Sequence, residues 1–97
     1  MELRSDDTDL ERLEVDTEYT GGRPLEIVRA YRKLVNFVRQ AQDEVDLQAC
    51  KFLGIEKLPV NSPQYSLRLN DQWRLVIEFE QGKPTKKLVI IAIKDDH

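Results

Sequence analysis

Hydrophobic and polar positions alternate between residues 64 and 79, which is the pattern of half-buried β-strands. The apolar members stand at every second position on either side of a short polar interruption: Tyr65, Leu67 and Leu69, then Trp73, Leu75, Ile77 and Phe79. Asn70 and Asp71 form that interruption, and both residue types favour tight turns. The segment is therefore predicted to be a β-hairpin, with Trp73 and Phe79 in the core.

A different period, with apolar residues three and four positions apart, predicts a helix over residues 24–42. Pro24 suits the first helical position, and Glu26 is favourable in the first turn. The apolar stripe consists of Ile27, Val28, Tyr31, Leu34, Val35, Val38 and Ala41. The opposite face carries Arg29, Arg32, Lys33 and Arg39, and we interpret it as a solvated surface.

Shorter patterns predict the remaining elements. They are a strand at residues 2–4, a helix at 9–15, one or two helical turns at 43–50, a strand at 52–58 that Pro59 ends, and a strand at 87–93. The last of these is apolar on both parities, as expected of a strand covered on both faces. The order β-α-α-β-β-β-β predicts an α+β fold, in which N-terminal helices pack against a small, curved, mostly antiparallel sheet.

The size of the chain predicts one domain over residues 1–97. Cys50 is the single cysteine and His97 the single histidine, so an internal disulfide is impossible and a structural zinc site lacks ligands. The N-terminal residues lack signal-peptide features, and the longest apolar run, residues 88–93, is too short to span a bilayer. We expect a soluble, cytoplasmic protein in a reducing compartment, with no membrane partner.

The net charge of −3 is unevenly distributed along the chain. Residues 1–50 carry a net charge of −5, and residues 51–94 carry +4. Arg68 and Arg74 occupy polar positions of the predicted hairpin, where guanidinium groups on rigid strands could bind a phosphodiester bidentately. The alternative is ordinary cross-strand pairing with a carboxylate, for which the candidates are Asp71, Glu78 and Glu80.

Several motifs resemble the HigB-like branch of the RelE/ParE toxins. The most specific is Asn70-Asp71-Gln72-Trp73-Arg74, and the supporting ones are Gln64-Tyr65-Ser66, Tyr19-Thr20-Gly21-Gly22 and the terminal Asp95-Asp96-His97. The order of elements agrees, so the resemblance spans the chain. It implies the toxin of a type II toxin-antitoxin system, a ribosome-dependent endoribonuclease that cuts messenger RNA without a cofactor. It also implies a HigA-like, helix-turn-helix antitoxin as partner, with operator DNA contacted only through that antitoxin.

The resemblance also implies roles for individual residues. Arg74 would contact the phosphate, and Arg68 would be a second cation. His97 would transfer a proton, because the reference pKa of histidine lies near neutrality. Lys57 and Asp95 are further candidates for the catalytic site. The simpler interpretations are a solvated strand end for Lys57 and an unstructured terminus for His97.

Three departures from the family fall on this chemistry. Gly54 stands where relatives commonly carry a histidine, residues 59–62 replace a basic loop, and Asp96 replaces a tyrosine. Fewer cations neutralise fewer phosphates, which weakens RNA binding. Two alternatives therefore stay open. One is a weakened or inactive toxin relative that acts as an antitoxin-binding module, and the other is a ParE-like inhibitor of gyrase.

Overall fold

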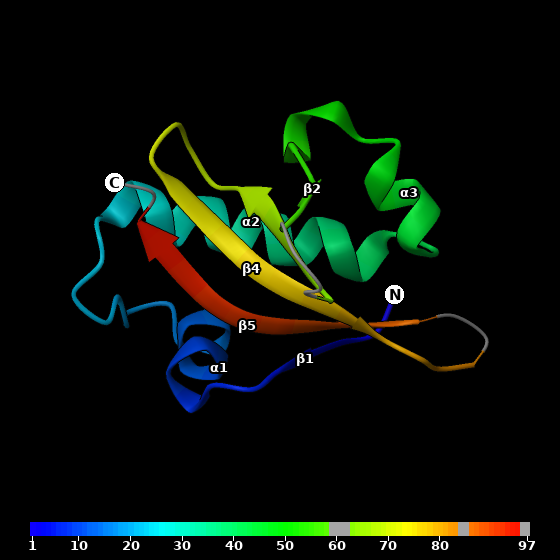
Figure 1. The fold of residues 1–97 in the computed structure, drawn as a ribbon. Coiled ribbons are helices and arrows are strands. Elements are labelled where there is room, and N and C mark those ends of the chain that lie inside the picture. Colours follow the sequence, from blue (N-terminus) through cyan, green and yellow to red (C-terminus); the bar gives the residue numbers. More distant parts are fainter. Residues whose placement is uncertain (59–62, 84–85, 96–97) are drawn as a thin grey trace.

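The computed structural model describes residues 1–58, 63–83 and 86–95 (Figure 1). In chain order the elements are β1 (Leu3–Ser5), α1 (Thr8–Val15), α2 (Leu25–Gln40), α3 (Glu44–Gln48), a 3₁₀ turn η1 (Lys51–Leu53), β2 (Glu56–Lys57), β3 (Gln64–Arg68), β4 (Trp73–Glu80) and β5 (Lys87–Asp95). The predicted order of two helices and five strands is confirmed, and α3 corresponds to the helical turns expected near residues 43–50. The replaced loop at residues 59–62, Asp96 and His97 lie outside the described residues.

The strands form one sheet in the order β1-β5-β4-β3-β2. β1 runs parallel to β5, and the other three pairings are antiparallel. Figure 1 shows β4 and β5 as the two long, strongly twisted strands at its centre. The predicted α+β fold with a mostly antiparallel sheet is therefore confirmed.

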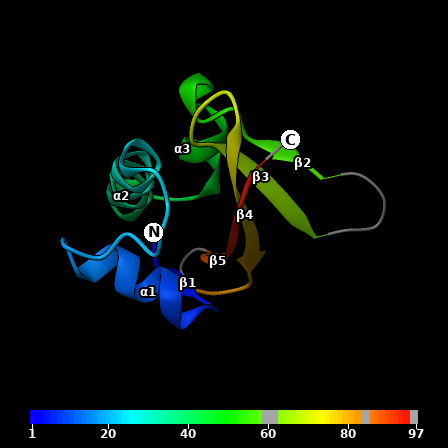
Figure 2. The same cartoon turned by 90° about the vertical axis from the view of Figure 1, so that its left-hand side faces the viewer.

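The core lies between the helices and one face of this sheet. Figure 2 shows α1 and α2 on the same side of the strands. The buried side chains of that layer come from every helix and from the three central strands, and include Leu10, Leu13, Tyr31, Val35, Val38, Leu47, Leu67, Leu75, Ile77, Leu88 and Ile90. No helix in the described part of the chain is long and apolar enough to cross a membrane.

The central helix follows its predicted stripe but not every predicted detail. Pro24 precedes the first turn, where its carbonyl accepts the N–H groups of Ile27 and Val28. The helix stops at Gln40 because Ala41 is extended, with ψ at 145°. Its basic face is not simply solvated. The Arg32 guanidinium donates to three backbone carbonyls at and beyond the end of α1, those of Leu13, Asp16 and Tyr19.

The hairpin is confirmed, and its turn is built by one side chain. Asn70 Oδ1 accepts the backbone N–H groups of Gln72 at 2.8 Å and Trp73 at 2.7 Å, which is the local turn chemistry expected of asparagine. Asn70 Nδ2 also donates to Glu26 Oε1 at 2.7 Å, which ties the tip of the hairpin to the first turn of α2. Trp73 and Phe79 are half-buried rather than fully buried, and the Phe79 ring packs edge-on against Tyr65.

The strand predicted over residues 52–58 is mostly wrong. Lys51–Leu53 form a 3₁₀ turn, and only Glu56–Lys57 join the sheet. The cause is Gly54, which adopts the left-handed region with φ at 55° and ends the turn. Of the apolar residues there, Leu53 is buried, whereas Phe52 is 61% exposed.

The last strand is covered on both faces along part of its length. Leu88, Val89 and Ile90 are buried, and the next three residues are half-buried. A bulge explains the apolar run on both parities: Val76 pairs with Ala92 but Ile77 pairs with Ile90, so Ile91 is an extra residue. The bulge therefore changes which parity of β5 faces the helices.

Candidate functional site

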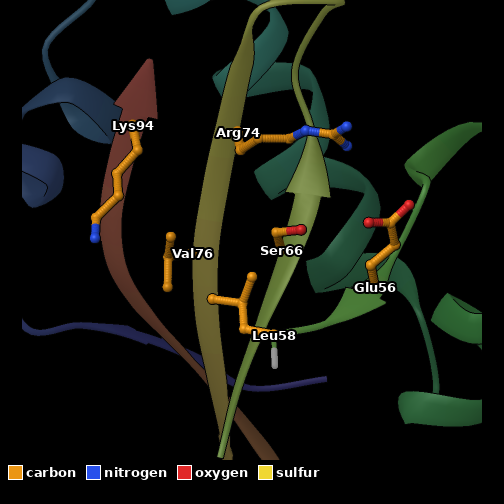
Figure 3. Close-up of a pocket in the computed structure, with 6 residues that line it drawn as sticks. All are labelled: Glu56, Leu58, Ser66, Arg74, Val76 and Lys94. Atoms are coloured by element: carbon orange, nitrogen blue, oxygen red, sulfur yellow. The ribbon is translucent and has the colours of Figure 1, made fainter. Parts of the chain in front are cut away.

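A pocket of about 360 Å³ opens on the face of the sheet away from the helical core (Figure 3). Its walls come from four neighbouring segments: Glu56 and Leu58 from β2 and the residue after it, Ser66 from β3, Arg74 and Val76 from β4, and Lys94 from β5. Four of these six side chains are polar or charged, and three carry a formal charge. The pocket therefore offers both positive charge and a carboxylate on a rigid surface.

The register of three strands produces a line of cations across this face. Arg68 on β3 is the partner of Arg74 on β4, and Arg74 is the partner of Lys94 on β5. We call these three residues the cationic row. Like charges directly opposite one another destabilise a sheet, so the row is a cost to folding. A polyanionic ligand such as an RNA backbone would offset this repulsion between the cations.

The three cations do not all extend in the same direction. Figure 3 shows the Arg74 side chain crossing above β3 towards β2, while Lys94 extends along β5. Arg74 is half-buried and Lys94 is exposed, and both line the pocket. The pocket therefore presents one half-buried arginine side chain and one exposed lysine side chain.

Arg68 belongs to the row by register, but its side chain extends to the edge of the sheet. A Cβ atom placed on Gly54 would lie 3.4 Å from Arg68 Cβ and 3.6 Å from its Nε. The side chain thus packs beside Gly54 and lines a separate groove between the hairpin, α2 and η1. The structure places Arg74 in the open pocket but not Arg68.

Glu56 is the pocket residue that the sequence analysis missed. Its Cα partner is Ser66, which is buried in the floor of the pocket. Figure 3 shows the Arg74 side chain extending from β4 over β3 towards β2, the strand that carries Glu56. One signal could have identified it, because Glu56 is the only acidic residue between Asp46 and Asp71 in the sequence.

Lys57 and Asp95 do not share this pocket. Lys57 pairs with Tyr65, one position along from Glu56, and alternation places its side chain on the opposite face of the sheet. Asp95 pairs with Trp73, one position along from Lys94, so it too leaves the pocket face. Both Asp95 carboxylate oxygens lie 3.2 Å from Gln72 Nε2. Both residues therefore lie outside this pocket, and the catalytic roles expected for them stay predictions.

The alternative of ordinary cross-strand ion pairs is not what holds Arg68. Within the described residues, Arg68 forms no ion pair, and Glu80 is bound by Arg4 at 2.7 Å instead. That contact with Arg4 lowers the pKa of the Glu80 carboxyl. His97, expected to transfer a proton, lies outside the described residues, so its role stays a prediction.

The motif of residues 70–74 forms the hairpin turn, and its contacts determine the position of Arg74. Asn70 forms the turn, and Gln72 connects that turn to Asp95 at the end of β5. Trp73 pairs with Asp95 and starts β4, which leaves Arg74 as the first side chain of the strand on the open face. The motif thus fixes the position of the guanidinium through its neighbours.

The α+β fold of this chain matches that of a solved toxin structure. The solved structure of a YoeB/ParE toxin from Agrobacterium tumefaciens matches with a TM-score of 0.64, covering 100% of both chains. The two sequences are 13% identical, so the likeness concerns the fold. No protein-family model and no curated protein matches the sequence.

Proposed function

We propose that this chain is the toxin of a type II toxin-antitoxin system and acts as a ribosome-dependent endoribonuclease. The observation that carries the proposal is the joint presence of Arg74, Lys94 and Glu56 around one pocket on the open face of a toxin-type fold. Cleavage of a phosphodiester by its own 2′-hydroxyl needs a proton acceptor and cations near the phosphate. The pocket contains both.

In the proposed reaction, the ribose 2′-oxygen attacks the adjacent phosphorus while its proton passes to the Glu56 carboxylate. The guanidinium of Arg74 and the ammonium of Lys94 bind the phosphate oxygens as negative charge accumulates on them. The bond to the 5′-oxygen then breaks, and that oxygen takes a proton from His97. The products are a 2′,3′-cyclic phosphate and a 5′-hydroxyl end, and no metal takes part.

The partners follow from the same proposal. The ribosome would hold the messenger RNA in place, which lessens the need for strong RNA binding by a chain with a net charge of −3. A cognate HigA-like, helix-turn-helix antitoxin would neutralise the toxin, contact operator DNA for both proteins, and act with it in the cytoplasm. Membership of the HigB-like branch is part of this proposal.

A second function is favoured by the positions of the other candidate residues. Arg68 packs beside Gly54, and Lys57 and Asp95 leave the pocket face, so three of the five residues expected in the catalytic site stand apart from Arg74. A chain that retained only the fold and its partner surface would act as an antitoxin-binding module without cleavage. Inhibition of gyrase is a third outcome that the same experiment identifies.

The test is induction of the full chain alone in a bacterial host, with growth curves and mapping of RNA 5′ ends. Glu56→Gln and Arg74→Ala remove the proposed base and the phosphate contact. Glu18→Gln and Arg29→Ala are matched controls, because both residues are exposed and lie outside the pocket. Soluble yield and thermal stability of each variant are measured in parallel.

Growth arrest with ribosome-phased cuts is expected for the parent chain and for both controls. The cut ends should carry 5′-hydroxyl groups, and the cuts should be lost in Glu56→Gln and Arg74→Ala. Arrest with DNA damage and without RNA cuts would replace the proposal with gyrase inhibition. Growth without arrest from a well-expressed chain would favour the antitoxin-binding module.

A further inference from the structure

A groove of about 210 Å³ runs between α2, η1 and the tip of the hairpin, apart from the open-face pocket. It is lined by Ala30, Lys33, Leu34, Phe52, Arg68 and Leu69. We propose that this groove, called here the α2–η1 groove, binds an acidic segment of a partner protein that inserts a large apolar side chain. The inference goes beyond RNA cleavage, because it would hold equally for a chain without catalytic activity.

The apolar part of the groove supports an inserted side chain. Ala30, Leu34 and Leu69 provide aliphatic walls, and Phe52 is 61% exposed although it is one of the largest apolar residues in the chain. The Phe52 ring packs edge-on against Phe37, with the ring centres 5.3 Å apart. An exposed aromatic side chain beside a concave apolar wall is typical of the anchor of a protein interface.

The rim of the groove supports an acidic partner. Lys33 and Arg68 both line it, and neither forms an ion pair or hydrogen bond within the described residues. Three other arginines near α2 are occupied: Arg23 is bound to Asp9, Arg39 to Glu14, and Arg32 to backbone carbonyls. Arg29 is also unpaired among the described residues, but it does not line the groove. The groove thus keeps two uncommitted cations beside an apolar surface, and carboxylates next to an apolar anchor complement that arrangement.

RNA is a poorer match to the same groove. Three of the six lining side chains are aliphatic, and these offer no group that binds a phosphate. The groove volume suits one large side chain of a peptide. A nucleic acid that tracked the open face would instead meet Arg74 and Lys94, which lie in the other pocket.

The test is selection of random dodecapeptides by display on the full, folded chain, followed by affinity measurement of the enriched peptides. We expect enriched sequences to combine Asp or Glu with Leu, Phe or Trp. Phe52→Ser and Lys33→Glu should each weaken binding at least about tenfold. Val15→Ser is the matched control for Phe52→Ser, because Val15 is 77% exposed on α1 outside the groove, and it should leave affinity unchanged.

Phe52→Ser and Lys33→Glu change exposed side chains, so both variants should keep the fold. Melting curves of the two variants check this directly. Enrichment of basic or uncharged peptides would overturn the proposal. The proposal would also be overturned if acidic peptides were enriched but bound Phe52→Ser and Lys33→Glu with the same affinity as the parent chain. A single-stranded RNA dodecamer that binds the parent chain and is weakened by Phe52→Ser would assign the groove to nucleic acid instead. None of these results depends on whether the chain cleaves RNA.

Discussion

Replacing Arg32 with alanine removes the hydrogen bonds by which α2 holds the end of α1. Arg32 Nε donates to the carbonyl of Leu13 at 3.0 Å, and Nη2 donates to the carbonyls of Asp16 at 2.8 Å and Tyr19 at 3.0 Å. A hydrogen bond with one charged partner contributes about 1.5 to 3 kcal/mol. Because one nitrogen serves two acceptors and the side chain is half-buried, the three together should contribute about 3 kcal/mol.

Such a loss is large for a domain of this size. A change of 1 kcal/mol shifts the melting temperature of a small domain by about 4 to 8 °C, so Arg32→Ala should melt at least about 12 °C lower. Urea unfolding followed by far-ultraviolet circular dichroism measures the free energy directly. Arg32→Lys keeps the charge but loses the planar fork that reaches three acceptors, and it should recover less than half of the difference.

Arg29→Ala provides the control on the same helix, because Arg29 is exposed and forms no ion pair or hydrogen bond among the described residues. Its free energy of unfolding should change by at most about 0.5 kcal/mol. Equal losses for Arg29→Ala and Arg32→Ala would refute the reasoning, since the effect would then come from net charge or helix propensity. A loss below about 1 kcal/mol for Arg32→Ala would show that water replaces the guanidinium at those carbonyls.

Three further predictions use other parts of the molecule. Asn70→Ala leaves the N–H groups of Gln72 and Trp73 without their acceptor, so the free energy of unfolding should fall by about 1 to 2 kcal/mol. Urea unfolding measures this loss, and Asp71→Ala, a change at the exposed neighbour, should have little effect. Burial raises the pKa of the Tyr31 phenol, so the folded state keeps a proton that the unfolded chain releases. Stability should therefore be complete below about pH 10 and fall as the pH rises further, and urea titrations should show a shallower fall for Tyr31→Phe. In single-turnover cleavage of ribosome-bound messenger RNA, Glu56→Gln should lower the rate about 10² to 10⁴-fold with an unchanged melting temperature, and an unchanged rate would exclude Glu56 as the base.

The elements that could be predicted from sequence are those whose signals are local. The hairpin follows from the alternation of its side chains and the turn chemistry of Asn70, and the core face of α2 follows from its apolar period. The prediction of a strand at residues 52–58 was mostly wrong for a reason that is also local but harder to recognise. Gly54 adopts the left-handed region and separates a 3₁₀ turn from a two-residue strand.

The candidate site was predictable only in part, because it depends on which strands become neighbours. Arg74 was identified from the motif, but Lys94 and Glu56 become its neighbours through pairings between segments far apart in the chain. The same pairings place Lys57 and Asp95 on the other face. Arg32 was interpreted as solvated because its partners are backbone carbonyls, which no side-chain pattern reveals.

The direction of the Arg68 side chain depends on the size of residue 54, because the two residues lie side by side. The Arg68 side chain packs where a Cβ atom of residue 54 would be in ordinary contact with Arg68 Cβ and Nε, and within 3.9 Å of its Cζ. A larger side chain at position 54 would need the volume that the Arg68 guanidinium fills, and it would also be strained at a φ of 55°. Gly54 therefore has a direct effect on the position of Arg68. It leaves room for Arg68 to pack beside η1, at the rim of the α2–η1 groove, instead of beside Arg74 in the open pocket.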